Sequence, residues 1–201
     1  MDKSILSDFA ITNITELSNY LKLVALKLMK DEIKPDVNTV KFDIAGFFDA
    51  GRPTNGMDCH TSACAVGHFA LMHDLKHDKE GAYTKDGEFF EWRHFSEECV
   101  GIKQWGEQGT VWEFLFSGKW AFVDNTPLGA AARIDHFLEH GVPDGFIKSP
   151  IFQETGIYSP IKASAKNEIV GPYLLRRQTL EAECLKAHNH INRASHGATH
   201  G

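Results

Sequence analysis

Apolar residues recur at intervals of three and four positions in several separate segments of the chain. Residues 15–30 follow this spacing, and Thr15 stands where an N-cap is expected, so this segment predicts a helix. The start and stop signals of a helix are clearer at 126–141. Thr126 can cap the first turn, Pro127 suits the first helical position and Gly141 suits the end, so this segment also predicts a helix. Pro172 predicts the start of a final helix that continues to about residue 192.

Other segments alternate with a period of two, which is typical of strands. Val40, Phe42 and Ile44 alternate with polar residues and predict a short strand with one buried face. Farther along, Asp86-Gly87 separates two β-prone runs, which favours a hairpin with a two-residue turn. These strands are few and short beside the helical segments.

Residues 97–120 predict one or two short helices interrupted by glycines, with Ser96 and Thr110 as caps. The region around them is dense in phenylalanine and tryptophan. Its charged residues are mostly glutamates, whereas a nucleic-acid surface would place lysine and arginine between such rings. We therefore expect these rings to form a core and do not expect nucleic acid as a partner.

Together these patterns predict a mainly helical α+β protein: a single compact domain with a small β-hairpin and a C-terminal helical tail. Residues 1–145 are expected to form the main domain. Residues 146–201 are expected to form a connection, the last helix and a polar end. The chain of 201 residues is long enough to bury one full core.

The charge of −6 is unevenly distributed along the chain. From residue 161 onward, six lysines and arginines face three glutamates, whereas the rest of the chain is acidic. Such a basic segment suits docking on its own body, on a second copy or on an acidic protein partner. The chain shows neither a signal peptide nor an apolar run long enough for a membrane span, so we expect a cytoplasmic protein with reduced cysteines.

The most reactive segment is 58–77, DCHTSACAVGHFALMHDLKH, with two cysteines and four histidines in twenty positions. One interpretation is a zinc site. On a helix that starts near Ser62, Cys64 and His68 share a side, and Cys59 could join them. Structural zinc needs four ligands, so the set Cys59, Cys64 and His68 would need a fourth, for which the candidates are Cys99, His94 and Asp58.

A second interpretation makes Cys64 a catalytic nucleophile, because a helix N-terminus stabilises a thiolate. It requires a base, for which His94 or His136 could serve. A third interpretation is packing alone: the helix is apolar nearly all round, and Ala63, Gly67 and Ala70 would let another element approach closely. We favour packing and keep zinc and the thiol as alternatives.

The stretch DCHTSACAVG resembles a motif of small uncharacterised bacteriophage and prophage proteins, Cys-Gly-Thr-x-x-Cys-x-Ala-Gly. Cys59, Thr61, Cys64 and Gly67 match it, whereas His60 and Val66 differ. WEFLFSGKW and TPLGAAARIDHFLEHG also resemble segments of that group, so the likeness spans roughly residues 40–140. It implies no reaction. We expect a non-enzymatic protein that binds another protein, as an assembly component or a modulator of a host protein, in the host cytoplasm or in a virion.

Overall fold

The computed structural model describes residues 3–29, 41–42, 48–49, 62–63, 65–77, 80–117, 120, 124, 126–143, 146 and 175–189. Its elements, in chain order, are η1 (Lys3–Ile5), α1 (Asp8–Met29), β1 (Lys41–Phe42), β2 (Phe48–Asp49), β3 (Ser62–Ala63), α2 (Ala65–Met72), β4 (Gly81–Tyr83), β5 (Phe89–Glu91), α3 (Trp92–Phe95), the π-helical turn η2 (Ser96–Val100), η3 (Gly106–Gln108), α4 (Gly109–Phe116) and α5 (Pro127–His140). Residues 175–189 form a last helix, called here the C-terminal helix. The predicted mainly helical α+β class is confirmed.

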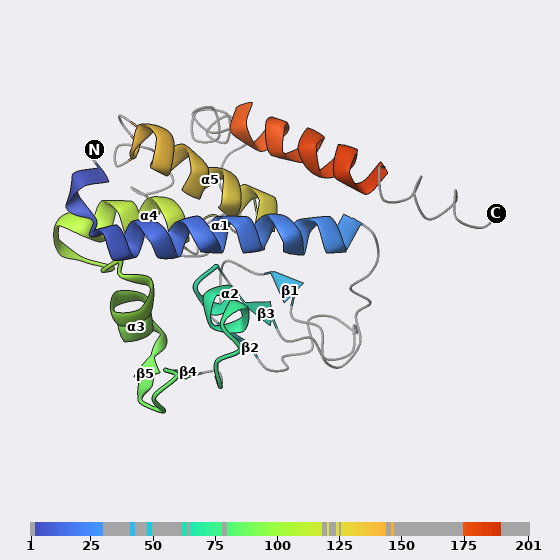
Figure 1. The fold of residues 1–201 in the computed structure, drawn as a ribbon. Coiled ribbons are helices and arrows are strands. Elements are labelled where there is room, and N and C mark those ends of the chain that lie inside the picture. Colours follow the sequence, from blue (N-terminus) through green and yellow to red (C-terminus); the bar gives the residue numbers. More distant parts are fainter. Residues whose placement is uncertain are drawn as a thin grey trace, which may run out of the picture.

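Helix α1 is the central element of the fold (Figure 1). Helix α5 and the C-terminal helix lie along one side of it, and α2 lies on the other side with the short strands. The strands β1 and β2 both pair with β3, β1 in parallel and β2 antiparallel. A buried face of α1 packs against α5, and Ile14, Leu17 and Leu21 have no exposed surface there.

The start of α1 differs from the sequence prediction. The helix begins at Asp8, so Thr15 lies inside it, where its hydroxyl donates to the carbonyl of Ile11 at 2.7 Å. The cap is Ser7, whose hydroxyl accepts from the N–H of Ala10 at 3.2 Å. The helix extends beyond the predicted window because Ala10 and Ile14 continue the buried face toward the N-terminus.

The hairpin of β4 and β5 is confirmed, but its turn is longer than predicted. Tyr83 pairs with Phe89, and the N–H of Thr84 donates to the carbonyl of Glu88 at 2.8 Å, which leaves three residues at the tip. Gly87 has a φ of 85°, the left-handed conformation that a three-residue hairpin loop requires. The Asp86-Gly87 pair therefore correctly predicts a hairpin turn with a glycine in the left-handed conformation, but the turn has three residues at its tip instead of two.

Most of the described aromatic rings of this segment form the core that its composition predicts. Among the described rings, six are buried: Trp92, Phe95, Trp112, Phe114, Phe116 and Trp120. Phe89 and Trp105 are exposed instead. Phe114 meets Trp120 and Phe146 edge to face, and Arg133 from α5 lies fully buried with its guanidinium 4.5 Å above the Trp120 ring. This core joins α4 to α5.

The predicted caps of this region have other roles. Ser96 is fully buried within the π-helical turn, where its hydroxyl donates to the carbonyl of Ile102 at 3.1 Å and accepts from the Trp112 indole at 3.2 Å. Thr110 lies inside α4. Gly101 ends the π-helical turn with a φ of 86°, and a Cβ there would press on Ala10 of α1, so the glycine both turns the chain and admits the neighbouring helix.

Candidate functional site

The first turn of α5 carries a small polar cluster. As predicted, Thr126 is the N-cap: its Oγ1 accepts from the N–H of Gly129 at 2.9 Å. The same hydroxyl donates to Oδ1 of Asp124 at 2.6 Å. The Asp124 carboxylate is thereby fixed beside the positive end of the helix dipole, where a negative charge is stabilised.

Gly129 is required by the position of this carboxylate. A Cβ on Gly129 would overlap the carboxyl group of Asp124. The residue does not have a positive φ, so the need for glycine comes from the close approach and not from the backbone conformation.

Asp124 also holds the C-terminal helix. Its Oδ2 accepts from Nε of Arg177 at 3.3 Å, and Nη1 of Arg177 donates to Oε2 of Glu181 at 3.0 Å within the C-terminal helix. Arg177 is 18% exposed and Asp124 13%. The polar cluster is thus partly screened from water and links two segments that are 53 residues apart in the chain.

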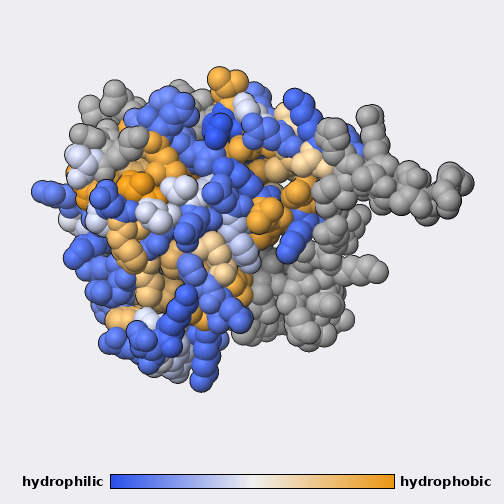
Figure 2. Space-filling view, viewed as in Figure 1, coloured by the Kyte–Doolittle hydropathy of each residue, from blue (hydrophilic) through white to orange (hydrophobic). Residues whose placement is uncertain are grey.

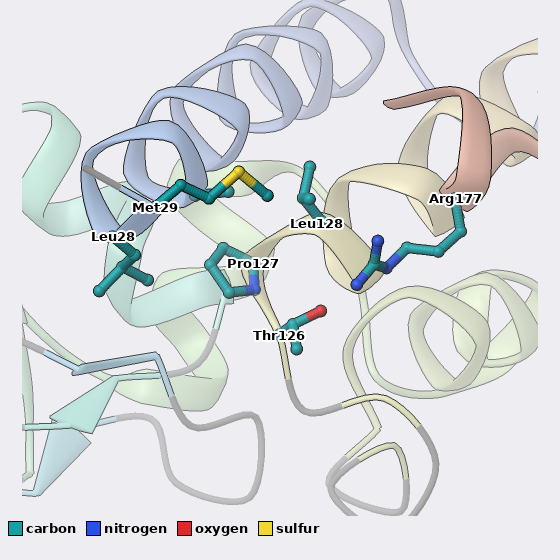
Figure 3. A pocket seen from close by; sticks show the side chains of 7 residues that line it. Leu28, Met29, Thr126, Pro127, Leu128 and Arg177 are labelled. Carbon is teal, nitrogen blue, oxygen red and sulfur yellow. The ribbon is translucent and has the colours of Figure 1, made fainter. Parts of the chain in front are cut away.

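An open pocket lies next to this cluster, where α1 ends, α5 begins and the C-terminal helix passes (Figure 3). It encloses about 250 Å³. Five apolar residues form most of its lining: Ala25, Leu28, Met29, Pro127 and Leu128. Thr126 and Arg177 are the polar residues of the lining. The side chain of Met29 extends toward Leu128, and the Arg177 guanidinium is directed toward the first turn of α5 (Figure 3).

A second polar cluster lies deeper between the same three helices, around Asp135 of α5. This carboxylate is 8% exposed and accepts from Ser18 Oγ at 2.5 Å, from Lys22 Nζ at 2.8 Å and from Arg176 Nη2 at 2.8 Å. Burial acts to raise the pKa of Asp135, but the bonds from Lys22 and Ser18, the charge of Lys22 and the bond from Arg176 outweigh it, and the pKa is lowered. Asp135 is therefore ionised, and its oxygens are engaged in holding helices together.

The described thiols are poor nucleophiles. Burial, with help from Glu98 and Glu88, raises the pKa of Cys99 to about 11. Burial also raises the pKa of Cys184, which is buried on the C-terminal helix. Both thiols are protonated at neutral pH, and thiolate chemistry requires the opposite.

Only some of the residues predicted for zinc binding or for thiol catalysis are among the described residues. Cys59, Cys64 and Asp58 lie outside the described residues. His68 is on α2 with 1% of its surface exposed, and its ring centroid is 6.3 Å from that of Tyr20 on α1. The expected helix start near Ser62 is wrong: Ser62 and Ala63 form β3, and α2 begins at Ala65. The pairing of β3 with β1 and β2 keeps Ser62 and Ala63 extended, so these two residues are not part of the helix.

The proposed partners of these residues lie on other elements. His94 is exposed on α3. His136 is on α5 against Phe114, and burial lowers its pKa, as does the nearby His140, while Glu139 opposes this effect. Among the residues that the structure describes, no group of three histidine, cysteine, aspartate or glutamate side chains is arranged to hold a metal ion. The zinc set Cys59, Cys64 and His68 stays a prediction, as does Cys64 as a nucleophile.

The pocket and the two polar clusters were not identified from the sequence. The only local signal was the cap at Thr126, which marks the start of α5 but not what gathers beside it. In the sequence Arg176 and Arg177 are only two charges of a basic segment, because their partners Asp135 and Asp124 are 41 and 53 residues away.

Compared with known protein families, curated protein sequences and solved structures, the chain matches none. The resemblance to phage proteins therefore remains an interpretation of the sequence. Within the described ranges, no helix combines the length and the apolar character that a membrane crossing needs.

Proposed function

We propose that the protein acts by binding another protein, without catalysing a reaction, and that the pocket between α1, α5 and the C-terminal helix receives a side chain of the partner. The lining of the pocket carries this proposal. The pocket is open on one side, and its walls are apolar apart from Thr126 and Arg177. Such an open apolar recess suits an anchoring side chain of a protein partner.

The surface seen in Figure 2 agrees with such a contact. On this face, apolar side chains lie in several patches that polar side chains interrupt. A broad apolar surface would favour a permanent interface, whereas a small apolar pocket within a polar surface is typical of a contact with one or a few anchors.

The titratable groups where α5 and the C-terminal helix meet have structural roles. Asp135 and Asp124 are bound by basic side chains, and Cys184 is protonated and packed. A general base has to take up a proton, which the lowered pKa of Asp135 disfavours, and a cysteine nucleophile has to be a thiolate. These groups therefore favour a binding function for this region over a catalytic one.

The sequence resemblance to bacteriophage proteins supplies the biological setting of the proposal. In that setting the partner is either another component of a phage assembly or a host protein that the phage modulates. Self-association is a special case of the first alternative.

A photo-crosslinking residue in the wall of the pocket tests the proposal. Benzoylphenylalanine replaces Leu28, and in a matched control it replaces Lys85 at the exposed tip of the β4–β5 hairpin. In cells that make the protein, we expect position 28 to crosslink to one discrete protein that position 85 does not capture. Mass spectrometry then shows whether it is a host protein, a phage component or a second copy. Identical products from both positions, or no product from position 28, would contradict the proposal.

A further inference from the structure

We infer that the pocket recognises an apolar side chain that lies beside a carboxylate in the partner protein, and that Arg177 is the residue that selects for the carboxylate. The inference rests on the proposed function and goes further, because it assigns a chemistry to the partner segment. It is carried by the division of the pocket into an apolar wall and one cationic side.

The apolar part accounts for the anchor side chain. Ala25 and Leu128 are buried, and Leu28 and Met29 at the end of α1 complete the wall. Methionine adapts its shape to an incoming group because its side chain is unbranched and flexible. A leucine-sized or phenylalanine-sized group would bury apolar surface on all of these residues.

The cationic part has unused capacity to bind. A guanidinium has five N–H donors in a planar fork. In the part of the chain that the structure describes, Arg177 donates from Nε to Asp124 and from Nη1 to Glu181, and neither bond uses Nη2. The guanidinium is directed toward the first turn of α5, which forms the pocket's edge (Figure 3).

The existing partner Glu181 is easily replaced. It is 49% exposed and lies four residues from Arg177 on the same helix, and such exposed pairs contribute little to stability. A carboxylate of the bound partner could therefore take Nη1 and Nη2 together, in the bidentate geometry that arginine favours. Asp124 would remain on Nε and would oppose the second carboxylate by repulsion.

Two small probes separate the apolar and the charged contributions. N-acetyl-leucine carries a leucine side chain beside a carboxylate, and N-acetyl-leucinamide carries the same side chain beside a neutral amide. Each is titrated into the full chain, and binding is measured from the ¹³C-methyl NMR shifts of Met29 and Leu128. We expect the acid to bind about fivefold more tightly than the amide, the preference that a partly exposed ion pair provides.

Three variants assign this preference to Arg177. In Arg177→Gln the preference for the acid should disappear or reverse, because Asp124 then only repels the carboxylate. In Asp124→Asn the preference for the acid should exceed that of the wild type, because the repelling charge is gone while the amide oxygen can still accept from Thr126. Lys186→Gln, which removes an exposed charge from the same helix, is the control and should leave the preference unchanged. If Arg177 only supported the helix, the preference for the acid would survive in Arg177→Gln.

The inference is overturned by equal affinities of the two probes for the wild type, by a preference that survives in Arg177→Gln, or by the absence of shifts at Met29 and Leu128 with either probe. Should Arg177→Gln lose binding of both probes, Asp124→Asn decides, and an unchanged preference there refutes the inference. Equal affinities together with a specific crosslink from position 28 would refute carboxylate recognition and leave the proposed protein binding intact.

Discussion

At the scale of single residues, one contact explains both a sequence feature and the attachment of the C-terminal helix. Asp124 lies against Gly129, accepts from Thr126 and holds Arg177. The run Thr126-Pro127-Leu128-Gly129 shows in the sequence as a helix start. The structure adds that its glycine is the place where the helix makes room for an acidic side chain, which in turn binds a distant arginine.

Gly129→Ala should therefore destabilise the protein, although alanine normally stabilises a helix by about 0.5–1 kcal/mol relative to glycine. The added methyl group would displace the Asp124 carboxylate, and we expect a loss of about 1–2 kcal/mol, as for other overpacked sites. Urea denaturation measures it. The matched control is the same change in an Asp124→Ala background, where it should be neutral or stabilising. Equal losses in both backgrounds would contradict the steric explanation.

At the scale of elements, the sequence predicts what local signals specify. Helix α5 was predicted nearly to the residue, because its cap, its proline and its terminal glycine all lie within the segment. The start of α1 was missed, since Thr15 resembles a cap although the buried face continues to Ala10. At Ser62–Ala63 the sequence predicts the start of a helix and the structure has a strand, because two residues carry no periodicity and only pairing with β1 and β2 defines them.

The Asp135 carboxylate of α5, which binds side chains of α1 and of the C-terminal helix, makes the stability of the protein depend on pH. In an unfolded chain the pKa of an aspartate is about 3.9. The pKa of Asp135 is lower in the folded protein, so the ionised form favours folding. This contribution is complete above the unfolded pKa and is lost as the pH falls through the folded pKa. Stability should therefore decline on acidification below about pH 4 through this group.

Asp135→Asn isolates the effect. At pH 7 we expect a loss of about 2–3 kcal/mol, less than for a fully enclosed pair because Lys22 and Arg176 are partly exposed. Urea midpoints measured from pH 7 to pH 3 should show the difference from the wild type shrinking as Asp135 protonates. Asp86→Asn at the hairpin tip controls for the loss of one negative charge. A difference that stays constant down to pH 3 would refute the ionised role of Asp135.

At the scale of the whole molecule, two arginines of the basic C-terminal segment attach that segment to acidic residues of the same chain. The sequence left open whether the basic segment docks on its own body, on a second copy or on a partner. In the structure Arg176 and Arg177 bind Asp135 and Asp124 of the same chain, while Leu180 and Cys184 are the buried apolar residues of the C-terminal helix. The pairing could not be predicted, because charge counts do not specify which acid meets which base across 41 and 53 residues.

An attachment with two ion pairs and so few buried apolar side chains should open more readily than the core around α1. Arg176→Gln removes the bonds to Asp135, so amide hydrogens in residues 175–189 should exchange about five- to tenfold faster, whereas those in the middle of α1 should change much less. Lys186→Gln, an exposed change on the same helix, is the control and should leave these rates unaltered. Hydrogen exchange with mass spectrometry measures both regions in one experiment. If Arg176→Gln accelerates exchange equally in α1 and in residues 175–189, the C-terminal helix opens only with the whole protein, and its independent release is refuted.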